Sequence, residues 1–231
     1  MRKYSTVFFD LDHTLWDYDK NSRETLTELY HDYGFNDRKN VSLEDFLASF
    51  HKVNQKLWAN YNKGHINRED IRNQRFKKIF KTFSIRHDPL ALEMSDEYIK
   101  RCPTKTNLMP HALTILDYLS PSYTLCLLTN GFNDVQSTKL TSSGLEVYFA
   151  YVITSESSGH RKPSKEIFQY SLSVAGATPE NSIMIGDNLN ADIYGARQAE
   201  MDQVYFNPLK IAHNQSVTHE IDCLSQLSQI L

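Results

Sequence analysis

Short hydrophobic runs alternate with longer amphipathic stretches along much of the chain. The runs are rich in β-branched and aromatic residues and have the length of buried strands. They cover residues 4–11, 125–129, 151–154, 182–185 and 203–206. Helical patterns separate most of them, as in residues 133–143 and 163–175, where Pro163 suits a first helical turn. Alternating strands and helices predict an α/β fold with a doubly wound parallel sheet.

Residues 16–105 show a different pattern. Four amphipathic stripes with i, i+3, i+4 spacing follow one another there without a convincing strand. Ser42 and Asn67 are placed to cap two of these helices. We therefore predict an all-helical domain over residues 16–105, inserted after the first strand of an α/β core that comprises residues 1–15 and 106–231.

Composition and charge are those of an ordinary globular protein. Of the 231 residues, 40% are hydrophobic and 23% are charged, with only 8 Gly and 7 Pro, which excludes collagen-like and largely disordered chains. The net charge is −3, from 25 basic and 28 acidic residues, and no run of Lys and Arg is longer than two. We therefore expect a small soluble ligand as partner, and neither a nucleic-acid polymer nor a membrane.

The cysteines and the N-terminal region bear on localisation. Cys102, Cys126 and Cys223 are too few and too scattered for a disulfide framework or a cysteine zinc site, which favours the reducing cytoplasm. Asp10 and Asp12 interrupt the first apolar run early, and no uninterrupted apolar stretch elsewhere approaches ~18 residues. We expect no signal peptide and no membrane span.

Polar residues follow the first two predicted strands. The first strand ends in two carboxylates, Asp10 and Asp12, and the second ends in Thr129, Asn130 and a glycine, which can hold a phosphate oxygen. Each pattern alone has an ordinary interpretation as an acidic turn or a Thr-Asn-Gly turn. Open α/β sheets, however, bind ligands at the carboxyl ends of their strands, so these positions favour a functional site.

Two later segments add charged residues to this set. Lys162 precedes a predicted helix start, where the helix dipole disfavours a cation, so a neighbouring anion would explain its position. A solvated surface lysine is the ordinary alternative. Asp187 follows the fourth run, and Asp192 lies five residues later, where a charge at a helix start is the ordinary interpretation. Oxygen ligands gathered at one edge of a sheet suit Mg²⁺.

Taken in order, these residues resemble the four motifs of the haloacid dehalogenase-like (HAD) hydrolase superfamily. The motifs are Asp-x-Asp-x-Thr at residues 10–14, a Thr after the second strand, a Lys, and Gly-Asp-x-x-x-x-Asp at residues 186–192. The helical insertion resembles the cap domain of the superfamily. Residues 128–131, 155–168 and 207–208 are similar to its pyrimidine 5′-nucleotidase branch. The resemblance covers essentially the whole chain.

The resemblance implies a phosphatase mechanism. Asp10 would be the nucleophile that forms an aspartyl-phosphate, and Asp12 would be the general acid and base. Mg²⁺ would be held by the carboxylates of Asp10 and Asp187 and by the backbone carbonyl of Asp12. Positive charge is needed because repulsion between a carboxylate and a phosphate dianion costs about 8 kcal/mol at short range. Unrelieved, this repulsion would cost about six decades of rate.

The resemblance also implies roles for the residues around the nucleophile. Thr129, Asn130 and Lys162 would bind the phosphate group. Thr14 and Asp192 would support the site, Asp192 either by holding a metal-bound water or by orienting Lys162. The helical insertion would act as a lid that excludes water and recognises the leaving group.

The expected function is hydrolysis of nucleoside 5′-monophosphates. The alternatives are a sugar-phosphate or phosphoglycolate phosphatase, a phosphomutase of the same superfamily and, more remotely, a non-enzymatic phospho-receiver or binding module. In the insertion, Arg72 and Arg75 could meet a nucleoside or sugar, and Trp58 and Tyr61 could stack on a base. Solvated arginines and a hydrophobic core are the ordinary interpretations of these residues. The sequence makes no prediction of the oligomeric state.

Overall fold

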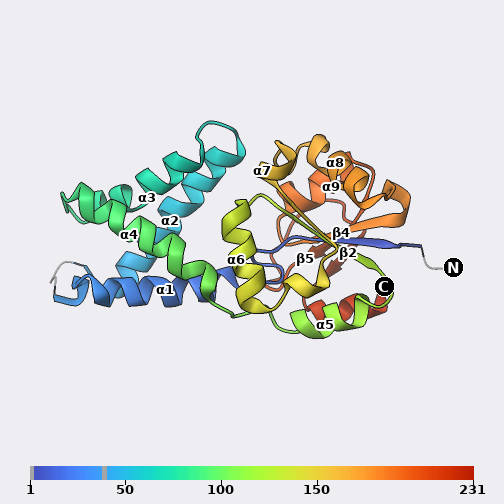
Figure 1. Ribbon diagram of the computed structural model, residues 1–231, viewed down its shortest axis with the longest axis horizontal. Helices are drawn as coiled ribbons and strands as arrows, with labels where there is room; N and C mark the ends of the chain where they lie inside the picture. Colours follow the sequence, from blue (N-terminus) through green and yellow to red (C-terminus); the bar gives the residue numbers. More distant parts are fainter. Residues whose placement is uncertain (1–2, 38–40) are drawn as a thin grey trace. The chain divides into compact units, whose positions relative to one another are not determined.

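The computed structural model describes residues 3–37 and 41–231 (Figure 1). The chain forms two compact units, one made of Met1–Tyr18 and Thr106–Leu231 and the other of Asp19–Lys105. In the described part of the chain, no helix combines the length and the hydrophobicity that a membrane crossing requires.

The first unit is built on a six-stranded parallel sheet with the strand order β3-β2-β1-β4-β5-β6. The strands are β1 Thr6–Phe9, β2 Thr124–Thr129, β3 Tyr151–Thr154, β4 Ser182–Gly186, β5 Asp202–Phe206 and β6 His219–Ile221. β1 lies between β2 and β4, with Phe9 opposite Leu127 on one side and Ile185 on the other. The predicted parallel α/β sheet is confirmed, and β6 is an additional strand that the sequence did not indicate.

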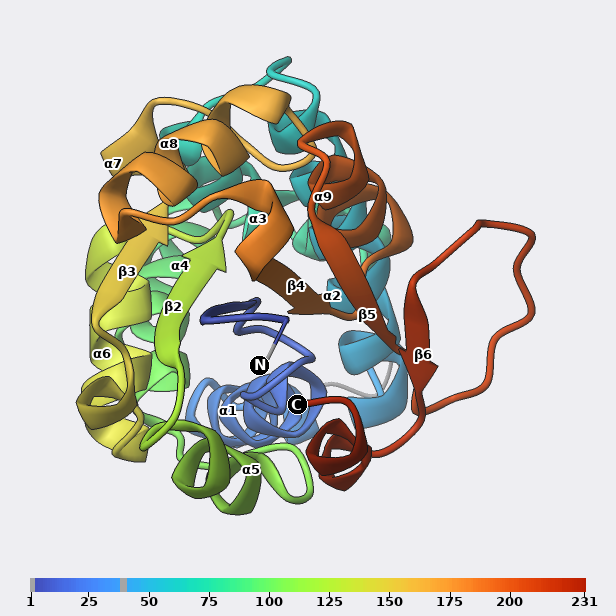
Figure 2. The ribbon, with the colours of Figure 1, turned by 90° about the vertical axis from the view of Figure 1, so that its right-hand side faces the viewer.

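Helices cover both faces of this sheet. They are α5 Ala112–Leu119, α6 Asn133–Ser143, α7 Ser155–Ser158, α8 Lys165–Ala175 and α9 Gly195–Gln198. Figure 2 shows α8 and α9 on one face and α5 on the other. On the α8 face, Phe8, Leu128 and Met184 of three adjacent strands pack in one core with Ile167 and Phe168 of α8. Burial on both faces explains why the central strands β1 and β4 are fully buried and largely apolar.

The start of α8 differs from the prediction that Pro163 occupies its first turn. The helix begins two residues later, at Lys165, and Ser164 takes the N-cap position in an extended conformation. The backbone N–H of Ser164 donates to the carbonyl of Arg161 over 2.8 Å, so the chain makes a turn before the helix starts. The peptide bond between Lys162 and Pro163 is cis.

The described residues of the second unit form helices and no strand, as the sequence predicted. Its helices are α1 Tyr18–Asp32, α2 Leu43–Asn62, α3 Arg68–Thr82 and α4 Asp88–Arg101. The side chain of Ser42 accepts a hydrogen bond from the backbone of Asp45 and caps α2. Asn67 forms a reciprocal capping box with Asp70 at the start of α3. Buried aromatic side chains, among them Phe76, hold the helices together.

The segments that lead out of and back into the first unit are adjacent. The backbone N–H of Asp17 donates to the carbonyl of Asn107 over 3.1 Å, and that of Met109 donates to the carbonyl of Leu15 over 2.9 Å. Trp16 forms an antiparallel bridge with Leu108 between these two bonds. The large insertion therefore begins and ends at a short two-stranded neck.

Candidate active site

The two carboxylates that follow β1 and β4 lie at the same edge of the sheet. Asp10 comes directly after β1 and Asp187 directly after β4, and the two strands are neighbours in parallel register. The backbone N–H of Asp10 donates to the carbonyl of Ile185 over 2.9 Å, which extends the strand pairing to Asp10. One carboxylate oxygen each from Asp10, Asp187 and Asp192 lies within 4.8 Å of the others. The structure thus brings Asp10 together with two acidic residues that lie more than 170 positions later in the sequence.

Lys162 lies among these carboxylates, as its unusual sequence position suggested. Its Nζ is 2.6 Å from Asp10 Oδ1, 2.6 Å from Asp192 Oδ1 and 2.7 Å from the carbonyl of Leu128, so each ammonium hydrogen has an acceptor. The side chain is 2% exposed. Burial acts to lower the pKa of Lys162, but the charges of Asp10 and Asp192 outweigh burial and raise it. Lys162 therefore stays charged.

Asp192 is held firmly against Lys162. Its Oδ1 accepts from Lys162, and its Oδ2 accepts from the backbone N–H of Asn188 over 3.0 Å. A Cβ at Gly186 would lie 2.3 Å from Asp192 Oδ2, so only glycine leaves room for this carboxylate. This direct contact with Lys162 corresponds to one of the two roles that the sequence left open for Asp192.

Thr129, the last residue of β2, and Asn130, which follows it, act in different ways. Asn130 binds the backbone of Lys162 with both ends of its amide: Nδ2 donates to the carbonyl over 2.9 Å, and Oδ1 accepts from the N–H over 2.8 Å. Thr129 Oγ1 accepts from Gly131 N over 3.1 Å and from Gln136 Nε2 over 2.7 Å. The side chain of Asn130 is therefore engaged in holding Lys162, while Thr129 keeps its hydroxyl hydrogen for another acceptor.

The carboxylate of Asp12 has partners that sequence reasoning missed. Lys139 Nζ lies 2.6 Å from Oδ1 and 2.8 Å from Oδ2, and Gln136 Nε2 lies 3.2 Å from Oδ2. Burial acts to raise the pKa of Asp12, but Lys139 and Gln136 outweigh it and lower this pKa. Thr14 is fully buried, with Oγ1 3.4 Å from Asp187 Oδ1, and so connects the loop after β1 to β4.

The charge at this edge of the sheet is unbalanced. Burial raises the pKa of Asp10 to about 7, against the opposing effect of Lys162. Burial and the charges of Asp10 and Asp192 raise the pKa of Asp187 to about 8. One lysine faces three carboxylates here, so the cluster favours an additional cation. Three oxygen donors with surplus negative charge match Mg²⁺ in both ligand type and charge.

The candidate residues of the second unit make contacts within that unit. Arg72 forms an ion pair with Asp96 over 2.7 Å on the surface. Arg75 is 5% exposed, and its guanidinium carbon lies 5.1 Å from the ring centroid of Tyr98. Tyr61 is 3% exposed and belongs to the helical core, which is the ordinary interpretation of its spacing.

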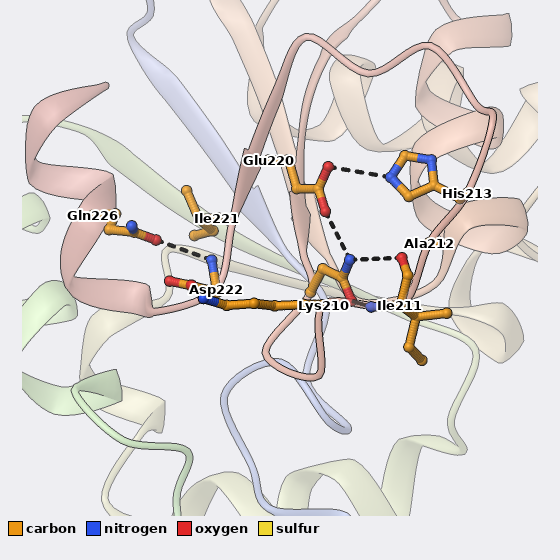
Figure 3. Close-up of a pocket in the computed structure, with 9 residues that line it drawn as sticks. Lys210, Ile211, Ala212, His213, Glu220, Ile221, Asp222 and Gln226 are labelled. Carbon is orange, nitrogen blue, oxygen red and sulfur yellow. Dashed lines mark hydrogen bonds and ion pairs between the residues drawn. The ribbon is translucent and has the colours of Figure 1, made fainter.

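A hollow of about 590 Å³ beside β6 contains none of the predicted site residues (Figure 3). Its polar groups pair with one another: His213 Nε2 lies 3.2 Å from Glu220, Asn207 donates to Glu220 over 2.7 Å, and Lys210 lies 2.7 Å from Asp222. Figure 3 shows Glu220 bound to His213, and Gln226 accepting from the backbone N–H of Asp222, in contrast to the surplus of carboxylates beside β1 and β4.

Comparisons with known proteins agree with this geometry. The family model of haloacid dehalogenase-like hydrolases matches residues 4–200. The pyrimidine 5′-nucleotidase PynA of Streptococcus pneumoniae is 31% identical over 96% of this chain and 96% of its own. A glyceraldehyde 3-phosphate phosphatase of Methanothermobacter thermautotrophicus is 29% identical over 97% and 98%. The crystal structure of the HAD-hydrolase YfnB from Bacillus subtilis bound to magnesium superposes with a TM-score of 0.88, at 29% identity and with 99% of each chain covered.

The chain belongs to the haloacid dehalogenase-like hydrolase family. The expectation that it is an enzyme of this superfamily is confirmed, and so is the resemblance to relatives of the pyrimidine 5′-nucleotidase branch.

Proposed function

We propose that the protein is a magnesium-dependent phosphomonoesterase that forms an aspartyl-phosphate on Asp10 and acts on nucleoside 5′-monophosphates. One observation carries the assignment of phosphoryl transfer. Asp10 is 8% exposed, lies 2.6 Å from a buried ammonium and shares a cluster of three carboxylates at the carboxyl edge of the sheet. A nucleophilic carboxylate beside fixed positive charge is what attack on a phosphate dianion requires.

The first half of the reaction transfers the phosphoryl group to the enzyme. A carboxylate oxygen of Asp10 forms a bond to phosphorus while the bond from phosphorus to the ester oxygen breaks. Asp12 gives the leaving oxygen the proton that it took from water in the previous turnover, and its lowered pKa makes the protonated carboxyl group a strong proton donor. Lys162 offsets the charge between nucleophile and phosphate, and the Thr129 hydroxyl donates to a phosphate oxygen, because both of its lone pairs are already used.

The second half regenerates the enzyme. Asp12, now a carboxylate, takes a proton from a water molecule whose oxygen attacks phosphorus, and the bond between phosphorus and the Asp10 oxygen breaks. Inorganic phosphate leaves, and Asp12 is protonated again for the next cycle. A side chain that serves as acid and then as base has to reach both the leaving oxygen and the water from one position.

Mg²⁺ would be held by the carboxylates of Asp10 and Asp187 and by the backbone carbonyl of Asp12, and it would supply positive charge that weakens the repulsion between Asp10 and the phosphate. Thr14 helps to hold the loop after β1 near Asp187. Asp192 and Asn130 keep Lys162 in place from its two ends, the ammonium and the backbone. We also assign the protein to the cytoplasm, which its free cysteines support.

The substrate assignment rests on the likeness to a pyrimidine 5′-nucleotidase over nearly the whole chain, together with the aromatic content of the helical unit. We propose that this unit acts as the cap that reads the leaving group. Stacking on a base is worth about 1–3 kcal/mol, which corresponds to roughly 5- to 150-fold in kcat/KM.

The test compares phosphate monoesters with and without a base. With Mg²⁺ present, uridine and cytidine 5′-monophosphate should exceed adenosine 5′-monophosphate in kcat/KM, and all three should exceed ribose 5-phosphate, glyceraldehyde 3-phosphate and phosphoglycolate. If ribose 5-phosphate is hydrolysed as efficiently as the nucleotides, the base is not recognised and the protein is a sugar-directed or broad phosphatase. Such a result would leave the proposed roles of Asp10 and Lys162 untouched.

A further inference from the structure

Two buried polar side chains of α6 have no part in the proposed phosphoryl transfer. Gln136 is fully buried and Lys139 is 4% exposed. They are three residues apart, so they lie on the same side of the helix, one turn from each other. Both donate to the carboxylate of Asp12, which receives three hydrogen bonds from this one helix.

Gln136 connects Asp12 to the residue at the end of β2. Its Nε2 donates to Asp12 Oδ2 over 3.2 Å and to Thr129 Oγ1 over 2.7 Å. An ionised carboxylate can only accept, so the amide must turn its NH₂ group towards Asp12. Its Oε1 is then buried with no hydrogen-bond partner in the described part of the structure. Leaving a buried carbonyl unpaired costs about 1–3 kcal/mol. The orientation of the Gln136 amide is therefore explained by the hydrogen bonds of its NH₂ group to Asp12 and Thr129 and not by packing alone.

The surroundings leave both side chains little freedom. A Cβ at Gly131 would lie 2.1 Å from Gln136 Nε2, so the amide can reach its partners only because residue 131 is glycine. Lys139 Nζ lies 4.5 Å from the ring centroid of Trp16, a fully buried side chain. Trp16 thus limits the ammonium on one side while Asp12 binds it on the other.

We propose that Gln136 and Lys139 are positioning residues for Asp12, which hold its carboxylate in one orientation and link that orientation to the Thr129 hydroxyl. This inference rests on the proposed function, in which Asp12 donates a proton in one half of the reaction and accepts one in the other. A carboxylate free to rotate would face the reacting oxygens only part of the time. Misplacing a catalytic group by about 1 Å can lower the reaction rate about 100-fold. Neither residue belongs to the four motifs, and neither touches the substrate in this assignment.

The test removes the ammonium of Lys139 and keeps its hydrocarbon stem. We would compare Lys139→Met with Lys139→Arg, which retains the charge, and with Lys165→Met, which removes an equal charge from an exposed lysine at the start of α8. The assays are steady-state kcat and KM on p-nitrophenyl phosphate, rapid-quench measurement of released nitrophenol, and trapping of the phosphoenzyme in acid. Nitrophenolate leaves without help from an acid, so the second half of the reaction, which needs Asp12 as base, is isolated.

We expect Lys139→Met to lower kcat about 100-fold, the lower end of the usual contribution of general acid–base catalysis. KM should fall with kcat, and a burst of one nitrophenol per active site should appear as the phosphoenzyme accumulates. Lys139→Arg should restore most of the rate, and Lys165→Met should match wild type. Circular dichroism checks that each variant is folded. If Lys139→Met does not fold, Gln136→Met takes its place, with the same burst expected at a smaller loss of rate.

Two results would overturn the inference. One is a Lys139→Met variant that behaves like Lys165→Met. The other is a folded Lys139→Met variant that loses activity with KM unchanged, without a burst and without rescue by Lys139→Arg. That pattern would mean that a smaller fraction of the enzyme molecules is active, and not that one step of the reaction is slower. Failure of the proposed function is a separate outcome: the wild type would then form no phosphoenzyme, or Asp10→Asn would still turn over.

Discussion

Replacing Asp10 by Asn should inactivate the enzyme and at the same time stabilise the metal-free protein. Asparagine keeps the shape of the side chain but is not a nucleophile, so no aspartyl-phosphate can form. It also removes a carboxyl group that resists ionisation, since burial raises the pKa of Asp10 to about 7 from an ordinary value of 3.8. Ionisation of Asp10 therefore destabilises the folded protein relative to the unfolded chain at neutral pH.

The sign and size of the effect follow from this pKa. Because the folded-state pKa is higher than the unfolded one, wild-type stability from this group is complete below pH 4 and is lost as the pH rises towards 7 and beyond. The interval from 3.8 to about 7 is worth about 4 kcal/mol at about 1.4 kcal/mol per pH unit, and this is an upper limit. Asp10→Asn should thus equal wild type near pH 4 and be more stable by up to about 4 kcal/mol near pH 8.

The assay is thermal unfolding followed by circular dichroism in EDTA between pH 4 and pH 8. For a chain of this size, the midpoint temperature of unfolding should change by about 2–4 °C for each kcal/mol of change in the free energy of unfolding. Asp202→Asn is the matched control. Burial acts to raise the pKa of Asp202, but Lys3 and Tyr4 outweigh it and lower this pKa, so its loss should destabilise the protein at high pH. The reasoning is refuted if Asp10→Asn is less stable than wild type at pH 8, or if the difference does not change with pH.

Two further changes test the cluster itself. Asp187→Ala should raise the Mg²⁺ concentration for half-maximal activity by about tenfold or more with little change in folding, because a metal ligand is lost; an unchanged Mg²⁺ titration would exclude Asp187 as a ligand. Gly186→Ala should destabilise the protein by about 1–3 kcal/mol and lower kcat, since the added Cβ would lie 2.3 Å from Asp192 and displace it from Lys162. Wild-type kinetics in Gly186→Ala would show that this contact is not needed.

Much of the sheet and its edge could be predicted from the sequence for a physical reason. Strands of a parallel sheet are buried on both faces, so they appear as short apolar runs, and the polar residues that follow them share one edge. This logic predicted that Asp10, Thr129 and Asp187 lie at one edge of the sheet, where the structure places them. It could not find β6, because His219–Ile221 is only three residues long and two of the three are polar.

The contacts of α6 lay beyond sequence reasoning. A buried lysine on a helix has the same sequence signature as a solvated one, and Lys139 becomes recognisable only when the packing of α6 brings it to Asp12. Asn130 is a similar case. Its position after β2 suggested a phosphate ligand, but only the folded chain shows both ends of its amide on the backbone of Lys162.

The neck formed by residues 15–17 and 107–109 has a consequence for how such enzymes diversify. Since the two ends of the insertion are already hydrogen-bonded to each other, the sheet does not depend on the insertion to bring them together. Insertions of different length or sequence can be accepted at this point while the strand order and the residues after β1 and β4 stay as they are. Exchange of whole insertions between relatives is therefore a practical route to recombining leaving-group recognition with an unchanged catalytic sheet.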